Sequence, residues 1–178
     1  MALKATVYRA GVQVSDIDRG YYDTRTLTLA RHPSETEERL MLRVLAFVMH
    51  AEPGLDFGRG LSTDDEPDLW LRDDAGEIRL WIDVGLPDER RLRRAAGRSR
   101  AVALVTYGER ATDVWWRKHE AALARLKTLS VWSVSDEDCA GLASLAARSM
   151  SLQATLQDGQ ISLTDSRRYL VIEPARLQ

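Results

Sequence analysis

Cysteine is almost absent from this chain, and the single one, Cys139, has no partner for an intramolecular disulfide. The first residues lack the apolar segment and small-residue cleavage site of a secretory signal. The most apolar helical stretch, Leu40 to Met49, is far shorter than the roughly 20 residues that cross a bilayer. These absences predict a cytoplasmic protein that does not act in a membrane.

Lysine is also scarce: it stands only at positions 4, 118 and 127, so arginine makes up nearly all of the 25 basic residues. Basic and acidic residues almost balance, with a net charge of −2 and a pI near 6.0. The whole-molecule field therefore offers no attraction for nucleic acid. Any surface that binds nucleic acid must be local.

No Pro-, Gly- or Ser-rich stretch, low-complexity segment or internal repeat divides the 178 residues. With 44% hydrophobic residues, the chain is long enough to bury one substantial core. We therefore expect a single domain spanning residues 1–178.

Helical and strand periodicities alternate along the chain, which predicts an α/β fold with a mixed β-sheet sandwiched by helices. Strand pairs with turn residues between them are expected at both ends, and these could extend one sheet together. The expected strands are 4–14, 21–30, 69–71, 78–84, 101–107, 131–134, 151–156 and 160–164, and the expected helices are 34–49, 87–98, 110–127 and 136–147.

Two acidic residues mark the centre of the chain, in the segment PDLWLRDDAGEIRLWIDVG that begins at Pro67. A tight turn between its two strands brings Asp68 and Asp83 to the same end of a hairpin. Apolar strands normally exclude carboxylates, because an unpaired buried charge costs several kcal/mol. Either Asp68 caps a turn and Asp83 pairs with an arginine, or the two acids hold a cation.

This segment resembles the Pro-Asp and Asp/Glu-x-Lys signature of the PD-(D/E)XK nuclease superfamily, with Gly85 where the lysine is expected. The flanks, among them MALKATVYRAGVQVSDIDRG, VTYGERATDVWW and SLQATLQDGQISL, are similar to the bacterial YaeQ family over nearly the whole chain. The resemblance implies a PD-(D/E)XK-like core with added β-hairpins at both ends.

The same resemblance implies a Mg²⁺ or Mn²⁺ site with Asp68 and Asp83 as ligands and a glutamate from the first helix as the third. Glu38 flanks the apolar stripe of that helix and is the first choice for this ligand. Glu35 is the second choice, because it could instead form a solvated ion pair with Arg39, four residues later. With Ser34 as N-cap, Glu37 is expected to complete a capping box.

The missing lysine could be replaced from the helix DERRLRRAAGRSR, which has a local net charge of +4 over residues 88–100. Arginine cannot act as a general base, but it holds phosphate bidentately. Arg90, Arg91 and Arg94 lie nearest the start of this helix. The three histidines, His32, His50 and His119, show no metal-ligand spacing.

The sequence therefore favours a Mg²⁺-dependent nuclease-like protein that cleaves nucleic-acid phosphodiesters. The alternative is a non-catalytic member of the fold that binds nucleic acid or a protein of the transcription or repair machinery.

Overall fold

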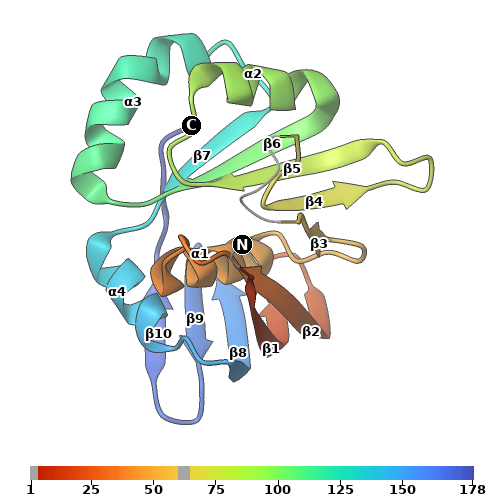
Figure 1. Ribbon diagram of the computed structural model, residues 1–178, viewed down its shortest axis with the longest axis vertical. Helices are drawn as coiled ribbons and strands as arrows, with labels where there is room; N and C mark the ends of the chain where they lie inside the picture. Colours follow the sequence, from red (N-terminus) through yellow and green to blue (C-terminus); the bar gives the residue numbers. More distant parts are fainter. Residues whose placement is uncertain (1–3, 60–64) are drawn as a thin grey trace.

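The computed structural model describes residues 4–59 and 65–178, and its chain forms four stacked layers (Figure 1). From one side to the other these layers are helices α2 and α3, a six-stranded sheet, helix α1, and a five-stranded sheet. Helix α4 lies beside α1. The helices are α1 (Glu37–Met49), α2 (Glu89–Arg98), α3 (Glu109–Leu123) and α4 (Asp136–Ser144).

The six-stranded sheet has the strand order β11-β7-β6-β5-β4-β3. Strands β5, β6 and β7 are parallel, and the remaining neighbours are antiparallel. Its strands are β3 (Asp56–Phe57), β4 (Leu69–Arg72), β5 (Ile78–Val84), β6 (Ser99–Thr106), β7 (Leu129–Ser133) and β11 (Ala175–Arg176).

The predicted terminal strand pairs form a second sheet rather than extensions of the first. Its order is β10-β9-β8-β1-β2, and the parallel pairing of β1 with β8 joins the two ends of the chain. The expectation of a single mixed sheet is therefore wrong: the fold has two mixed sheets. The strands are β1 (Thr6–Asp16), β2 (Tyr21–Arg31), β8 (Ser149–Gln157), β9 (Gln160–Thr164) and β10 (Tyr169–Ile172).

Helix α1 explains why the two sheets stack. Every residue from Leu40 to Val48 is buried, including Arg43. A helix segment that is mostly apolar on all sides needs cover on all sides, and here one sheet lies on each side of it (Figure 1). The sequence predicted burial along one apolar stripe of this helix, whereas the structure buries all of its faces.

The start of α1 corrects the predicted capping box. Thr36 is the N-cap, because its side-chain oxygen accepts from the backbone N–H of Arg39 at 3.1 Å. Glu37 is therefore the first helical residue, and its carboxylate accepts from the Tyr8 hydroxyl at 3.1 Å. Glu35 lies before the helix, where its backbone carbonyl accepts from Arg31 Nε at 2.8 Å and its carboxylate binds Arg39 and Arg43.

Two hydrophobic cores lie on the two faces of the six-stranded sheet. Ile82 and Val84 of β5 pack with α1, whereas Trp81 packs with Leu92 of α2. Because side chains alternate along a strand, Asp83 points to the same face as Trp81.

None of the helices in the described residues combines the length and the apolar character that a membrane-spanning helix requires.

Candidate functional site

The two acidic residues of the central hairpin lie at the same end of it, as the sequence predicts. Leu69 of β4 pairs with Ile82 of β5. Asp68 comes directly before Leu69 and Asp83 directly after Ile82, so both lie at the same end of the antiparallel pair. Both are buried, with 8% and 2% of their surfaces exposed. Such buried carboxylates require partners.

Asp68 is bound from the α1 side of the sheet. Both of its carboxylate oxygens accept from Nη2 of Arg39 at 2.9 Å, and Oδ2 also accepts from the backbone N–H of Val84 at 2.7 Å. The same Arg39 nitrogen donates to the Val84 carbonyl at 3.0 Å. Arg39 therefore anchors Asp68 to the end of β5.

Asp83 is bound from the opposite side, by α2. Arg91 donates from Nε to Oδ2 at 2.7 Å and from Nη2 to Oδ1 at 3.0 Å, and Nη2 also donates to the Glu66 carbonyl at 2.9 Å. A bidentate arginine–carboxylate pair is among the strongest charge-assisted contacts in proteins. Of the three predicted arginines, Arg91 is the one that meets an acid of the motif.

Glu35 belongs to the same network. Its expected ion pair with Arg39 forms, but the pair is buried and not solvated. Only 3% of Glu35 is exposed. It accepts from Arg39 Nη1 at 2.9 Å and from Arg43 Nε and Nη2 at 2.9 and 2.8 Å. The second arginine, Arg43, was not predicted, because Glu35 precedes the helix and a spacing of eight residues does not indicate a shared helix face.

Glu38 lies half-buried on another part of α1. Its negative charge contributes, after burial, to the raised pKa values of Tyr107 and Cys139, the latter reaching about 12. Glu35, in contrast, is linked to Asp68 through Arg39. Of the two glutamates, Glu35 is thus the one that the fold joins to the acidic pair.

Opposing effects determine the pKa of Asp68. Burial raises its pKa above the ordinary value, the Arg39 guanidinium opposes this rise, and the negative charge of Asp83 adds to it. The pKa of Arg39 is itself raised: burial disfavours its charge, but Asp68 and Glu35 outweigh the burial. Asp68 and Asp83 are therefore close enough to influence each other.

Three carboxylates and three guanidinium groups make up this arginine–carboxylate cluster, which we define as Glu35, Asp68, Asp83, Arg39, Arg43 and Arg91. Their formal charges cancel. A divalent cation prefers free oxygen ligands that carry negative charge, but the oxygens here already accept from arginine. Among residues 4–59 and 65–178, no group of three acidic, histidine or cysteine side chains is arranged to hold a metal ion.

Gly85, two residues after Asp83, has a conformation that suits glycine. Its φ is +123°, and its N–H donates to the Val105 carbonyl at 2.9 Å. A Cβ at this position would have open space around it, since no atom lies within 4 Å. The backbone, and not crowding, therefore disfavours a lysine at position 85.

A concave surface lies at the start of α2, lined by Asp88, Arg90, Arg91 and Arg94, with a volume of about 520 Å³. Asp88 caps the helix by accepting from the backbone N–H of Arg91 at 2.8 Å. Arg94 forms an ion pair with Asp65, but both side chains are more than half exposed. The exposed side chain of Arg90 makes no hydrogen bond or ion pair with the rest of the described chain. We call this surface the α2 cavity.

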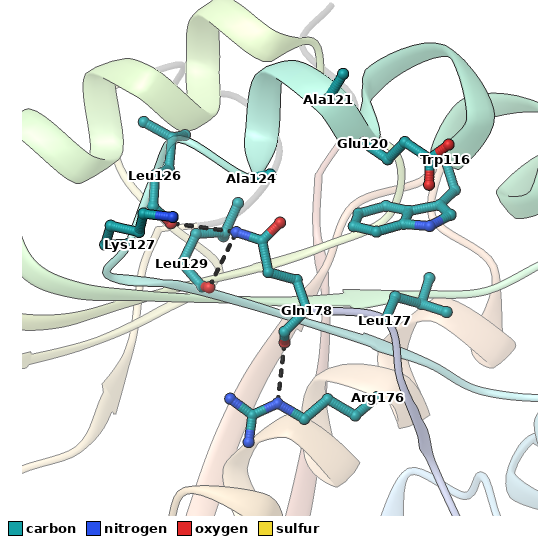
Figure 2. A pocket seen from close by; sticks show the side chains of 10 residues that line it. All are labelled: Trp116, Glu120, Ala121, Ala124, Leu126, Lys127, Leu129, Arg176, Leu177 and Gln178. Atoms are coloured by element: carbon teal, nitrogen blue, oxygen red, sulfur yellow. Dashed lines mark hydrogen bonds between the residues drawn. The ribbon is translucent and has the colours of Figure 1, made fainter.

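A second concavity is lined by the end of α3 and the C-terminal residues, as Figure 2 shows. The Trp116 ring lies above Leu177, and the Gln178 amide donates to the carbonyls of Leu126 and Leu129. Arg176 donates to the backbone carbonyl of Gln178 at 3.0 Å. The polar groups of this pocket thus largely satisfy one another.

Comparisons with known proteins give one consistent result. The family model described as YaeQ protein matches residues 1–174. The YaeQ protein of Salmonella typhi is 51% identical over 173 residues, covering 97% of this chain and 96% of the relative. That of Escherichia coli K12 is 50% identical over 172 residues, with 97% and 95% covered.

Two crystal structures share the fold. The YaeQ protein from Xanthomonas axonopodis pv. citri has a TM-score of 0.95 and 48% identity, with 98% of both chains covered. The YaeQ protein from Pseudomonas syringae has a TM-score of 0.93 and 34% identity, covering 98% of this chain and 96% of the other.

Proposed function

The chain belongs to the YaeQ family, and on that premise we propose that it is a non-catalytic, nuclease-like protein that binds the phosphodiester backbone of nucleic acid. The order of elements around the site supports a PD-(D/E)XK-like core: helix α1, the β4–β5 hairpin, helix α2 and strand β6. The observation that carries the proposal is the α2 cavity, in which three arginines surround one concave surface.

The α2 cavity has the chemistry that a phosphate group requires. Arg90 is exposed and has no partner in the described chain, so its guanidinium is available to an anion. Arg94 is 59% exposed and pairs with Asp65, which is 68% exposed. Such an exposed pair contributes about 0–1 kcal/mol, so a phosphate can compete for Arg94. The start of a helix adds a partial positive charge that favours anions.

The arginine–carboxylate cluster supports binding without cleavage. Arg91 binds Asp83 bidentately, and Arg39 binds both oxygens of Asp68. With these charges cancelled, the acids neither attract a cation strongly nor repel a phosphate at the adjacent cavity. Gly85, with its φ of +123°, provides no cationic side chain at the lysine position.

Fluorescence anisotropy with labelled single-stranded DNA, duplex DNA and RNA, in EDTA and at rising salt, tests this proposal. Arg90→Ala and Arg94→Ala should each weaken binding and lower the salt dependence by about one phosphate contact. Arg93→Ala is the matched control, because Arg93 lies on the same helix but pairs with Glu89 and does not line the cavity. Equal losses in all three variants, or no salt-sensitive binding, would refute the proposal and favour a protein partner.

The second candidate is Mg²⁺- or Mn²⁺-dependent cleavage of nucleic acid, with Asp68, Asp83 and either Glu35 or Glu38 as ligands. Its support is the electrostatic coupling of the two aspartates, since Asp83 contributes to the raised pKa of Asp68. As the side chains lie, Arg39 and Arg91 occupy the oxygens that a cation needs. Cleavage of any of the three substrates in Mg²⁺ or Mn²⁺, lost in Asp83→Asn, would establish this candidate instead.

A further inference from the structure

Strand β2 is the one long strand at the edge of a sheet within the described chain. The other edge strands are β10, β3 and β11, which contain four, two and two residues, whereas β2 contains 11. Proteins usually keep edge strands short or interrupt them with lysine, proline or a bulge, because a long open edge pairs with other strands. β2 contains no lysine, proline or glycine and pairs with β1 over its whole length without a bulge. The side of β2 away from β1, which we call the open edge, is therefore suited to a further strand.

The hydrogen bonds of β1 show which backbone groups of β2 face the open edge. The N–H of Arg9 donates to the Arg148 carbonyl at 2.9 Å, and that of Ile17 to the Leu156 carbonyl at 2.9 Å, so odd-numbered residues here face β8. Backbone groups alternate in direction along a strand. The even-numbered residues of β1 therefore face β2, where the register pairs them with odd-numbered residues. The even-numbered residues of β2 must then direct their N–H and C=O groups to the open edge.

Two of these outward groups are occupied from within the chain. The Thr24 N–H donates to Asp23 Oδ1 at 2.8 Å, and the Ala30 carbonyl accepts from Arg43 Nη2 at 3.0 Å. The edge near Ala30 is thus partly covered, whereas the part around Thr24 is held only by a neighbouring side chain. The residues whose outward N–H and C=O groups both lack a hydrogen bond in the described chain are Tyr22, Thr26 and Thr28.

The charges of this segment match a second copy of the same segment. Asp23 and Arg25 are the only charged residues from position 21 to 27, and Thr24 stands between them. A two-fold axis through Thr24 sets β2 antiparallel to its copy and places Asp23 opposite Arg25 of the other chain, twice. Because both residues direct their backbone groups to β1, they form pairs without hydrogen bonds to the copy, in which side chains come closest. Opposite charges directly across antiparallel strands stabilise the pairing.

From these observations we propose that the protein forms a dimer in which residues 21–27 of β2 pair antiparallel with the same residues of a second copy. The two five-stranded sheets then join into one. The Thr24 N–H donates to the Thr24 carbonyl of the second copy, which releases Asp23 to accept from Arg25. Tyr22, which is 65% exposed, packs on Thr26 of the second copy. This contact is independent of nucleic-acid binding, because no residue of β2 lines the α2 cavity.

Sedimentation velocity at concentrations up to about 0.5 mM tests the proposal, because it detects a dimer with a Kd of about 1 mM or lower. Wild type should approach twice the 20.1 kDa mass of the chain as its concentration rises. Asp23→Arg and Arg25→Asp should each remain monomeric, because each places like charges opposite each other. An equimolar mixture of these two variants should form a heterodimer, because one chain then carries arginine at both positions and the other carries aspartate at both.

Thr26→Pro should also abolish dimerisation, because it removes an N–H that faces the open edge in the monomer and binds the Tyr22 carbonyl of the second copy in the dimer. Thr28→Pro is the matched control: its N–H also faces the open edge, but Thr28 lies outside the paired segment, so the dimer should persist. If Thr26→Pro does not fold, the mixture of the two charge variants still decides the question. A monomeric wild type, a mixture that stays monomeric, or an equal effect of the two proline variants would overturn the proposal.

Discussion

Arg39 holds the centre of the arginine–carboxylate cluster, and replacing it with methionine should destabilise the protein strongly. The Arg39 side chain is 14% exposed, while those of Glu35 and Asp68 are 1% and 8% exposed. Arg39→Met keeps the length of the side chain but removes the bonds to Asp68, Glu35 and the Val84 carbonyl. Among the described residues, Asp68 then retains only the Val84 N–H as a partner.

The expected magnitude follows from the burial of these groups. Removing one partner of a buried ion pair costs about 3–5 kcal/mol, because the other charge stays buried without compensation. For a chain of this size, each kcal/mol lowers the melting temperature by roughly 2–4 °C. We therefore expect a loss of roughly 6–20 °C, measured by circular dichroism or calorimetry at pH 7.5.

The pH dependence gives this prediction a second test. Burial already raises the pKa of Asp68, and Arg39 opposes that rise. Without Arg39 the pKa rises further, and a raised carboxyl pKa means that stability is lost as the pH increases through it. The difference in stability between Arg39→Met and wild type should therefore be smaller at pH 5 than at pH 7.5. Adding Asp68→Asn to Arg39→Met should restore part of the lost stability.

Arg100→Met is the control, because Arg100 also contacts two carboxylates, Asp73 and Glu77, but is 61% exposed. Its melting temperature should stay close to that of wild type, because ion pairs at the exposed surface contribute little to stability. If Arg39→Met destabilises the protein no more than Arg100→Met does, the cluster is not a buried, mutually dependent unit, and the reasoning fails.

Three further predictions concern single positions. Gly85→Ala should lower the free energy of unfolding by about 1–3 kcal/mol, because Gly85 has a φ of +123°. Gly97→Ala in α2 is the comparison: a Cβ there has equal space and the residue has no positive φ, so this change should leave stability unchanged or raise it. Denaturant titrations of both variants measure the difference. The pKa of His50 is about 4 in the folded protein, against an ordinary value of 6.5, so the free energy of unfolding should fall by up to about 3 kcal/mol as the pH drops from 6.5 to 4. His50→Phe should remove this fall from a plot of unfolding free energy against pH. The same fall in the variant would contradict the lowered pKa. Cys139, buried and with a pKa raised to about 12, should react with a thiol reagent such as Ellman's only on unfolding, and rapid reaction of the native protein would contradict its burial.

The sequence predicts local structure well where the signal is local. The hairpin that carries Asp68 and Asp83 follows from two apolar strands and a polar turn, and the Asp158–Gly159 turn between β8 and β9 has the positive φ values that its residues favour. The pairing of β1 with β8 could not be predicted, because it joins segments about 140 residues apart and no local pattern specifies it.

The candidate site was only partly predictable for a related reason. The sequence left open whether Asp83 pairs with an arginine or holds a cation, and it placed Arg90, Arg91 and Arg94 near the site. In the structure Arg91 pairs with Asp83. The burial of Glu35 and Arg43 was not predictable, because charged residues on a helix are normally expected at the surface. Only the stacking of two sheets around α1 creates the enclosed environment in which they pair.

The central claim is that arginines neutralise the buried acids Asp68 and Asp83, and a Mn²⁺ titration followed by electron paramagnetic resonance tests it most directly. Wild type and Asp83→Asn should give the same weak isotherm, while Arg91→Met, which frees both oxygens of Asp83, should gain one Mn²⁺ site. That gain would show that the assay detects a site when the acid is unpaired. One Mn²⁺ bound per wild-type chain and lost in Asp83→Asn would contradict the claim and establish the acids as metal ligands.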